Sequence, residues 1–328
     1  MSLEDIKNIT IIGAGTMGHG IALTYALGGY NVTLQDINAD ILKKALANVR
    51  ADLDTLIRYE VITQAQADSA IANIKTETDL KEAVKDSDFV TEVVTEKVSV
   101  KQAIFSDLDK YCPEHTILAS NTSSLSTDQF TTQCQRRDKI LLTHWINPPH
   151  ITTIVEVVKC EHTSQETMDV ICDLIKKVGK DPVRIMREIP GLVHNRIQMG
   201  MIREVWALWE EGIASAEDID NVVKGGFGLR MASNGPLETC DLGGLDIWYA
   251  TANSLFGDIN DDHTPPERIK KMLEAGELGV KTGKGIFDYK DSAAAKDPAQ
   301  NIKERDRILI GLLKLRAVSY THLRAHET

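Results

Sequence analysis

Two residues in the stretch THWINPPHITTIVEVV have the types and the spacing of a general base and its partner. His144 lies near the end of one apolar run, and Glu156 lies inside the next. The connection is too short for a crossover between parallel strands, so we expect an antiparallel pair in which both residues are equidistant from position 150. An imidazole can take a proton from an alcohol, and a carboxylate on its other nitrogen fixes the tautomer. The same spacing suits a structural histidine–glutamate pair, so both interpretations stay open.

A glycine-rich segment near the N-terminus has the features of a phosphate-binding loop. Gly13, Gly15 and Gly18 have the G-x-G-x-x-G spacing, directly after the apolar run ITIIG and at the head of a helical pattern. In such a loop the three glycines allow a tight turn, a close approach of backbone to a pyrophosphate, and close packing of helix on strand. The amides near Thr16 and Met17 would then face the diphosphate at the start of the helix.

A carboxylate at the end of the next strand indicates which dinucleotide binds. NVTLQD ends at Asp36, and no lysine or arginine follows before Lys43. A carboxylate in this place accepts hydrogen bonds from the adenine ribose hydroxyls and repels a 2′-phosphate. We therefore predict NAD as the cofactor rather than NADP. The alternative is an exposed aspartate that caps a loop.

The order of the predicted elements indicates the fold that positions these residues. Short β-branched runs alternate with helix-length segments, which is typical of βαβ units and a mostly parallel sheet. We predict an α/β fold with a Rossmann-type doubly wound sheet, an antiparallel addition, and an all-helical C-terminal domain. The predicted strands are 9–13, 31–36, 88–94, 116–120, 140–146, 154–158 and 182–186.

The strand patterns stop at Pro190, which suggests a domain boundary just before it. Only helical patterns follow, at 192–212, 216–225, 243–256 and 265–275. We predict an NAD-binding Rossmann domain, a helical substrate and dimerisation domain, and a linker with an amphipathic helix. Their ranges are 1–188, 189–290 and 291–317. The last segment, VSYTHLRAHET (318–328), resembles a translated sequencing adapter, and we predict that it is a non-native tail.

The overall composition excludes several classes of partner. The chain has 328 residues, and 48 acidic against 37 basic residues give a net charge of -11, which disfavours nucleic acid. No apolar run is long enough to span a bilayer and no leader precedes the first strand, so we expect a cytoplasmic protein without a membrane partner. The five cysteines form no C-x-x-C pair, which argues against a disulfide framework and a zinc site.

Several segments, taken in chain order, resemble the 3-hydroxyacyl-CoA dehydrogenase family. They are GAGTMGHGIA, the strand end at Asp36, TEVVTEKVSVKQAIF, ASNTSSL, the histidine and glutamate described above, IPGLVHNRI, GPLETCDLGGLD and KTGKGIFDY. Independent motifs at matching separations make a chance match implausible, and the chain is identified as a member of this family. The resemblance implies an NAD-dependent, reversible oxidation of a short-chain L-3-hydroxyacyl-CoA to the 3-ketoacyl-CoA. It also implies a homodimer formed through the helical domain.

The resemblance assigns roles at the matching positions. His144 looks like the general base, and Glu156 looks like the residue that orients it. The other matches are Ser123 at the substrate oxygen, Asn195 near the reacting centre, Asn147 in the substrate loop, and Glu96 and Lys101 on the nicotinamide and ribose side of NAD. No metal is expected, because imidazole accepts the proton. A solvated helix face for Lys101 and a helix cap for Ser123 remain open.

Two departures from the family pattern bear on the substrate. The acyl-CoA enzymes usually read H-F-F-N-P where this chain has HWINPPH, which resembles the lambda-crystallin or L-gulonate dehydrogenase group and, more loosely, carnitine dehydrogenases. The segment ANVRADLDTLIRYE offers only Arg50 and Arg58, offset by acidic neighbours, to the phosphates of CoA. ASNTSSL and CDLGGLD, however, match the acyl-CoA branch. An NAD-dependent dehydrogenase of a free 3-hydroxy acid is therefore the alternative.

Two other classes fit the residues less well. A non-catalytic NAD-binding protein of the crystallin type would not need the base, its partner, the serine and the asparagine together. The β-hydroxyacid dehydrogenases share the glycine-rich start but rely on a lysine of the helical domain. They show no histidine and glutamate on paired strands.

Overall fold

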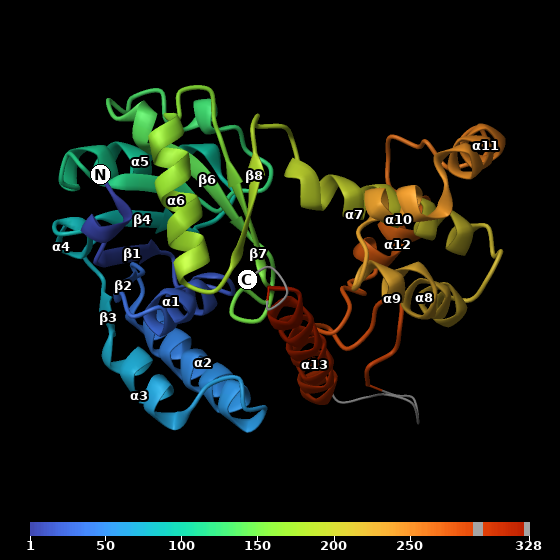
Figure 1. The fold of residues 1–328 in the computed structure, drawn as a ribbon, viewed down its shortest axis with the longest axis horizontal. Helices are drawn as coiled ribbons and strands as arrows, with labels where there is room; N and C mark the ends of the chain where they lie inside the picture. The colour runs from blue at the N-terminus through green and yellow to red at the C-terminus, as the bar shows by residue number, and fades with distance from the viewer. Residues whose placement is uncertain (291–297, 325–328) are drawn as a thin grey trace. The chain divides into compact units, whose positions relative to one another are not determined.

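The computed structural model describes residues 1–290 and 298–324, and the chain divides into two compact units, Met1–Asn195 and Arg196–Thr328. The first unit holds the sheet and its helices, and the second is helical (Figure 1). Residues 291–297, which hold most of the linker predicted at 292–300, and the last four residues lie outside the described residues.

An eight-stranded sheet forms the centre of the first unit, in the order β3-β2-β1-β4-β5-β6-β7-β8. Every neighbouring pair of described strands is parallel except β6 with β7, which is antiparallel. The predicted Rossmann-type sheet with an antiparallel addition is confirmed. The strands are β1 (Asn8–Ile12), β2 (Asn31–Gln35), β3 (Ile74–Glu77), β4 (Phe89–Glu92), β5 (Ile117–Ser120), β6 (Ile140–Trp145), β7 (Ile154–Val158) and β8 (Asp181–Ile185).

One strand of this sheet, β3, was not predicted from the sequence. Its residues, IKTE, contain a single apolar side chain, and no residue of the strand is fully buried. β3 pairs only with β2 and forms an edge of the sheet. An edge strand is held largely by backbone hydrogen bonds, so it can form without the apolar run from which strands are predicted.

The middle of the sheet is buried on both faces. All residues of β4, β5 and β6 are buried, and successive side chains of a strand point to opposite faces. Both faces are therefore covered, as in other parallel sheets flanked by helices. The helices of this unit are α1 (Gly18–Leu27), α2 (Ala39–Arg58), α3 (Gln64–Ala72), α4 (Leu80–Val84), α5 (Val98–Tyr111) and α6 (Gln165–Lys177), with 3₁₀ turns η1 (Leu3–Asp5), η2 (Thr127–Gln129) and η3 (Arg137–Lys139).

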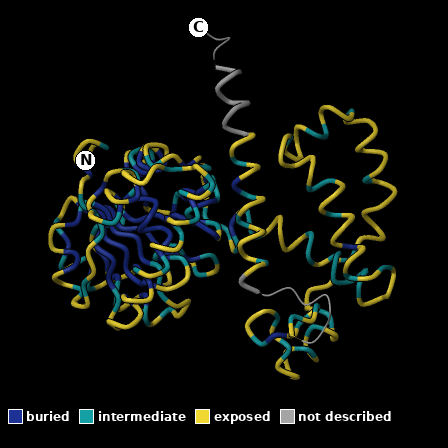
Figure 2. The backbone as a smooth tube through the Cα atoms, turned by 90° about the horizontal axis from the view of Figure 1, so that it is seen from below, coloured by how far each residue is buried: buried dark blue, intermediate teal, exposed yellow. Residues whose placement is uncertain are grey.

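The second unit consists of helices whose apolar side chains are widely exposed. Leu237, Leu242 and Phe256 are 82%, 72% and 75% exposed, whereas the central strands β4, β5 and β6 of the first unit are buried (Figure 2). The helices are α7 (Leu192–Glu210), which begins in the first unit, α8 (Ala216–Gly225), α9 (Phe227–Met231), α10 (Pro236–Gly243), α11 (Leu245–Leu255), α12 (Glu267–Glu274) and α13 (Pro298–Arg324). The short α9 and α10 were not predicted, and α13 continues past the expected start of the non-native tail at 318.

None of the helices in the described residues is both long and apolar enough to cross a membrane.

Candidate active site

The predicted pairing of His144 with Glu156 is present in the structure. The two residues are directly opposite each other in the β6–β7 ladder, as their equal distance from position 150 predicts. The Nδ1 atom of His144 lies 2.7 Å from the Oε2 atom of Glu156. Their residues are only 6% and 1% exposed, so the pair is held inside the sheet rather than at its surface.

The other oxygen of Glu156 is bound by the start of α7. The backbone amides of Val193 and His194 donate to Oε1 at 3.0 and 2.8 Å. Two successive amides that converge on one oxygen form an anion-binding nest, and the dipole of the following helix adds a favourable potential. The carboxylate therefore has three hydrogen-bond donors: one imidazole and two backbone amides.

An unusual backbone conformation precedes these two amides. Gly191 and Leu192 both have positive φ, 79° and 51°. Glycine adopts this region freely, but a leucine there is strained. Leu192 is buried in a cluster of apolar side chains that includes Leu142, Val158 and Ile185, and this packing holds the conformation. The turn at 191–192 thus orients the first amides of α7 toward the Glu156 carboxylate.

These contacts determine the charge of the glutamate. Burial alone would raise the pKa of Glu156, but the hydrogen bonds from His144 and from the His194 amide outweigh burial and lower that pKa. The pKa of His194 is lowered, chiefly because the imidazole is partly buried. Glu156 is therefore an ionised acceptor at neutral pH, which places the proton of neutral His144 on Nδ1 and leaves Nε2 as the acceptor.

The glycine-rich segment forms the turn between β1 and α1, and two of its glycines are sterically required. Gly13 has a φ of 103°, and a Cβ atom there would lie 2.8 Å from the carbonyl oxygen of Val93. A Cβ atom on Gly18 would lie 1.9 Å from the carbonyl oxygen of Gly13. No larger residue fits either position without movement of the backbone, because the obstructing atoms belong to the main chain.

The remaining part of the loop is open where a dinucleotide would bind. A Cβ atom on Gly15 would meet nothing within 4 Å, and Gly15 and Thr16 are exposed. Met17 is the N-cap residue of α1 and is half-buried. Asp36, one residue beyond β2, accepts a hydrogen bond from the Ala14 amide at 3.0 Å. The loop, the helix start and the carboxylate therefore meet at the carboxyl ends of β1 and β2, and they fit the pyrophosphate and ribose of NAD.

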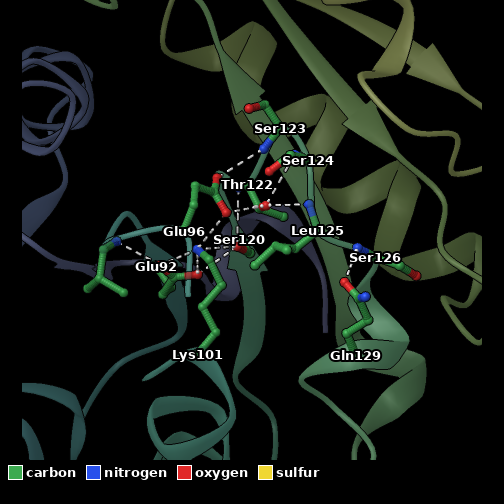
Figure 3. A network of polar contacts seen from close by, with 11 residues as sticks. Glu92, Glu96, Lys101, Ser120, Thr122, Ser123, Ser124, Leu125, Ser126 and Gln129 are labelled. Atoms are coloured by element: carbon green, nitrogen blue, oxygen red, sulfur yellow. Dashed lines mark hydrogen bonds and ion pairs between the residues drawn. The ribbon is translucent and has the colours of Figure 1, made fainter. Parts of the chain in front are cut away.

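Ser123, Glu96 and Lys101 come together at the ends of β4 and β5, but Lys101 does not face solvent. The Ser123 amide donates to Glu96 Oε1 at 3.2 Å. The Lys101 ammonium is 3.9 Å from Glu96 and 2.7 Å from Glu92, and only 1% of its side chain is exposed (Figure 3). The solvated helix face that the sequence left open for Lys101 is wrong. Glu92 was missed in the sequence, because its partner Lys101 comes from a separate element and no spacing along the chain pairs the two residues.

The two asparagines singled out in the sequence lie on different elements. Asn147 is exposed in the turn after β6, and Asn195 is half-buried in the first turn of α7, next to His194. A third asparagine was not anticipated: Asn121 Oδ1 accepts a hydrogen bond from the Trp145 amide at 2.8 Å. This bond joins the segment that carries Ser123 to the strand that carries His144.

A second group of histidines surrounds an aspartate of α2. The Oδ2 atom of Asp52 is 3.4 Å from His19 Nε2 and 3.5 Å from His150 Nδ1. Although burial lowers the pKa of His19, the contacts with Asp52 and with the Gly15 carbonyl raise it overall. The acidic residue that offsets Arg50 in the sequence is therefore part of a cluster that joins the cofactor loop, α2 and the β6–β7 turn.

One further group of polar side chains has metal-ligand geometry. The group consists of Asp128, Glu161 and His162, whose possible ligand atoms all lie within 4.8 Å of one another. Among the residues that the structure describes, no other three His, Cys, Asp or Glu side chains meet this criterion. Asp128 already forms an ion pair with Arg137, and Glu161 and His162 are exposed. The cluster supplies no observation that points to a bound cation.

The fold and site are those of an NAD-dependent dehydrogenase, and comparison with known families defines which kind. A model described as the NAD binding domain of 3-hydroxyacyl-CoA dehydrogenase matches residues 8–189, and a model of the C-terminal domain of the same enzymes matches residues 191–289. The chain belongs to the 3-hydroxyacyl-CoA dehydrogenase family. It is an oxidoreductase, and its cofactor is NAD.

Individual relatives differ in their substrates. The 5-formyl-3-hydroxy-2-methylpyridine 4-carboxylate 5-dehydrogenase of Mesorhizobium japonicum is 32% identical over 93% of this chain and 99% of that protein. A solved structure of an enzyme with this activity, an NAD+ dependent dismutase, is 30% identical with a TM-score of 0.87, covering 94% of this chain and 98% of that one. The 3-hydroxybutyryl-CoA dehydrogenase of Clostridioides difficile is 36% identical over 86% of this chain and 99% of that protein. The structure of (S)-3-hydroxybutyryl-CoA dehydrogenase from Ralstonia eutropha is 36% identical with a TM-score of 0.71, covering 87% and 100%.

Replacement of Glu156 by glutamine should destabilise the fold in a pH-dependent way. The pKa of Glu156 is lowered from its ordinary 4.5, so its charge stabilises the native state above that pH, and this stabilisation is lost as the pH falls through the lower folded pKa. We expect Glu156→Gln to reduce the free energy of unfolding by about 3 kcal/mol near neutral pH and by less at about pH 3.5. Urea unfolding at both pH values measures the difference. Glu161→Gln, at an exposed position, is the control, and an equal loss at both pH values would contradict the assignment of charge to Glu156.

Proposed function

We propose that His144 is the general base of a reversible alcohol oxidation and that Glu156 orients it. The observation that carries this proposal is the buried contact of 2.7 Å between His144 Nδ1 and Glu156 Oε2. With Nδ1 bonded to an ionised carboxylate, Nε2 can accept the hydroxyl proton, and the imidazolium that forms is stabilised by the same carboxylate. NAD, when bound, accepts the hydride from the carbinol carbon in the forward direction.

Ser123 and Asn195 complete the proposed site as hydrogen-bond donors to the substrate oxygen. A hydroxyl and an amide placed near the developing carbonyl can stabilise partial negative charge without a metal ion. Asn147 is assigned to the substrate loop, and Glu96 to the nicotinamide and ribose side of the cofactor. Asp36, with the loop from Gly13 to Gly18, binds the adenosine ribose and the diphosphate.

For the substrate we propose a short-chain L-3-hydroxyacyl-CoA. Support comes from the family to which the chain belongs and from the 3-hydroxybutyryl-CoA dehydrogenases that match along almost their whole length. A second candidate is a free hydroxy acid. The 5-formyl-3-hydroxy-2-methylpyridine 4-carboxylate 5-dehydrogenase favours a free acid over a CoA thioester, because the substrate in its name carries a free carboxylate and its similarity extends over 93% of this chain. The group that its name marks for dehydrogenation is an aldehyde rather than a carbinol. The Asp52 cluster also favours it, because a carboxylate beside the β6–β7 turn does not assist binding of the CoA phosphates.

A panel of substrates distinguishes the two candidates. NADH absorbance would be followed with 3-hydroxybutyryl-CoA and acetoacetyl-CoA, and with free 3-hydroxybutyrate, L-gulonate, L-carnitine and the pyridine 4-carboxylate at matched concentrations. A kcat/KM for the thioesters that exceeds every free acid supports the first candidate. Turnover of a free acid without turnover of either thioester replaces it with the second. Failure of every compound would contradict both.

Removal of the proposed base should abolish most turnover without loss of the cofactor. We expect His144→Ala to lower kcat by about 10²- to 10⁴-fold, because general base catalysis is worth that much. NADH affinity, measured by fluorescence titration, should stay unchanged, since His144 is assigned to the substrate hydroxyl and the cofactor is assigned to other residues. His162→Ala, at an exposed position, is the matched control. Turnover by His144→Ala at the wild-type rate would refute the assignment.

We also propose a homodimer whose interface lies on the helical unit. The support is the concentration of exposed apolar side chains there, including Leu237, Leu242, Tyr249 and Phe256, since monomeric proteins rarely leave large apolar patches in water. Light scattering coupled to size exclusion should give about twice the chain mass of 36.3 kDa. Leu237→Lys is expected to shift the mass toward that of one chain. A monomer for the unmodified protein at micromolar concentration would rule out the dimer.

For the location we propose the cytoplasm. All five cysteines carry free thiols, and four of them are buried. This usage is typical of reducing compartments. Cell fractionation with an antibody against the protein tests the proposal, and recovery from an extracytoplasmic fraction would contradict it.

A further inference from the structure

A buried ion pair links the ends of two strands beneath the proposed substrate serine. Glu92 ends β4 and Lys101 lies in the second turn of α5; their side chains are 0% and 1% exposed. The Lys101 ammonium contacts both oxygens of Glu92, at 2.7 and 2.8 Å, and the hydroxyl of Ser120, which ends β5, at 3.5 Å. Ser120 in turn donates to Glu92 at 2.6 Å (Figure 3).

The segment that carries Ser123 is shaped by side chains rather than by regular structure. The Thr122 amide donates to the Ser120 hydroxyl at 3.2 Å, and the Leu125 amide donates to the Thr122 hydroxyl at 3.1 Å. The Thr122 hydroxyl donates to Glu96 at 2.8 Å, and the Ser123 amide donates to the same carboxylate. Ser120 and Glu96 are therefore the two points from which the segment is held.

Lys101 is the cation common to both points. Its ammonium lies between the carboxylate of Glu92, which holds Ser120, and that of Glu96, 3.9 Å away. Without this charge, the buried carboxylate of Glu92 would have no cation to balance it, and it would repel the Glu96 carboxylate, whose side chain is 41% exposed. The short contacts of the Lys101 ammonium are therefore with Glu92, at 2.7 and 2.8 Å, and a longer one of 3.5 Å reaches Ser120, so this ammonium is bonded within the protein.

We propose that Lys101 and Glu92 are positioning residues that set the orientation of Ser123 through Ser120, Thr122 and Glu96. The inference rests on the proposed role of Ser123 at the substrate oxygen. It departs from the role that the family resemblance implies for Lys101, which is contact with the cofactor. A positioning role affects the chemical step, because a small displacement of a group that stabilises the transition state slows the reaction more than it weakens binding.

The test separates the chemical step from cofactor binding. Lys101→Met and Thr122→Val should each lower kcat by about 10- to 100-fold, while the dissociation constant of NADH changes by less than about twofold. Thr122→Ser keeps the hydroxyl and should recover most of the wild-type kcat. Lys97→Met, one turn earlier on an exposed position of the same helix region, is the control for loss of a lysine. Circular dichroism confirms that each variant is folded, and Thr122→Val carries the test if Lys101→Met does not fold.

The outcomes distinguish this inference from the proposed function. Ser123→Ala is measured in parallel, and an unchanged kcat for this variant would remove the role of Ser123 itself. A lowered kcat for Ser123→Ala together with wild-type kcat for Thr122→Val and for folded Lys101→Met would overturn the positioning role alone. Weakened NADH binding by Lys101→Met at unchanged kcat would return Lys101 to the cofactor site and overturn the inference as well.

Discussion

The carboxylate of Glu156 is the point on which the first unit's site depends. A carboxylate that is 1% exposed among apolar strands would be very unfavourable without partners. Its partners are the imidazole opposite it on β6 and two amides from the start of α7. The interaction that satisfies a buried charge therefore also sets the tautomer of His144 and the place where α7 begins. The hydrogen bonds that stabilise this carboxylate are thus the same ones that orient His144.

The carboxyl ends of the parallel strands collect the remaining polar groups, and burial separates their roles. Asp36 follows β2, Glu92 ends β4 and Ser120 ends β5. In a doubly wound sheet, ligands bind beyond the carboxyl ends of the strands, where these three residues lie. Asp36 is half-buried and bonded to backbone amides, so it can still accept from a ligand. Glu92 is fully enclosed by a lysine, a serine hydroxyl and the Val94 amide. Two carboxylates at equivalent strand ends thus differ in their surroundings: Asp36 is half-buried and bonded to backbone amides, and Glu92 is enclosed by partners within the protein.

Much of the fold and the central pair could be predicted because they depend on local periodicity. The β6–β7 pairing follows from two apolar runs with a short connection, and the symmetry about position 150 gives the partner of His144. The edge strand β3 was missed because its IKTE sequence lacks an apolar face. The Glu92–Lys101 pair and the Asp52 cluster join residues from separate elements, and no spacing along the chain encodes such contacts. The amides of Val193 and His194 carry no side-chain signature, so only the three-dimensional arrangement reveals them.

Leu192 has a backbone conformation that is unfavourable for leucine, but its side chain packs where a large apolar residue is needed. Glycine would adopt a φ of 51° without strain, yet the leucine side chain is what fastens this turn to the apolar cluster beneath it. Protein engineering guided by backbone preference alone would select Leu192→Gly as an improvement. Such a change would remove conformational strain, but it would leave a cavity in the apolar cluster and a more flexible turn at 191–192. The two amides that follow would then be more mobile than the carboxylate they bind. Relief of backbone strain at residue 192 would therefore weaken the orientation of these amides toward Glu156.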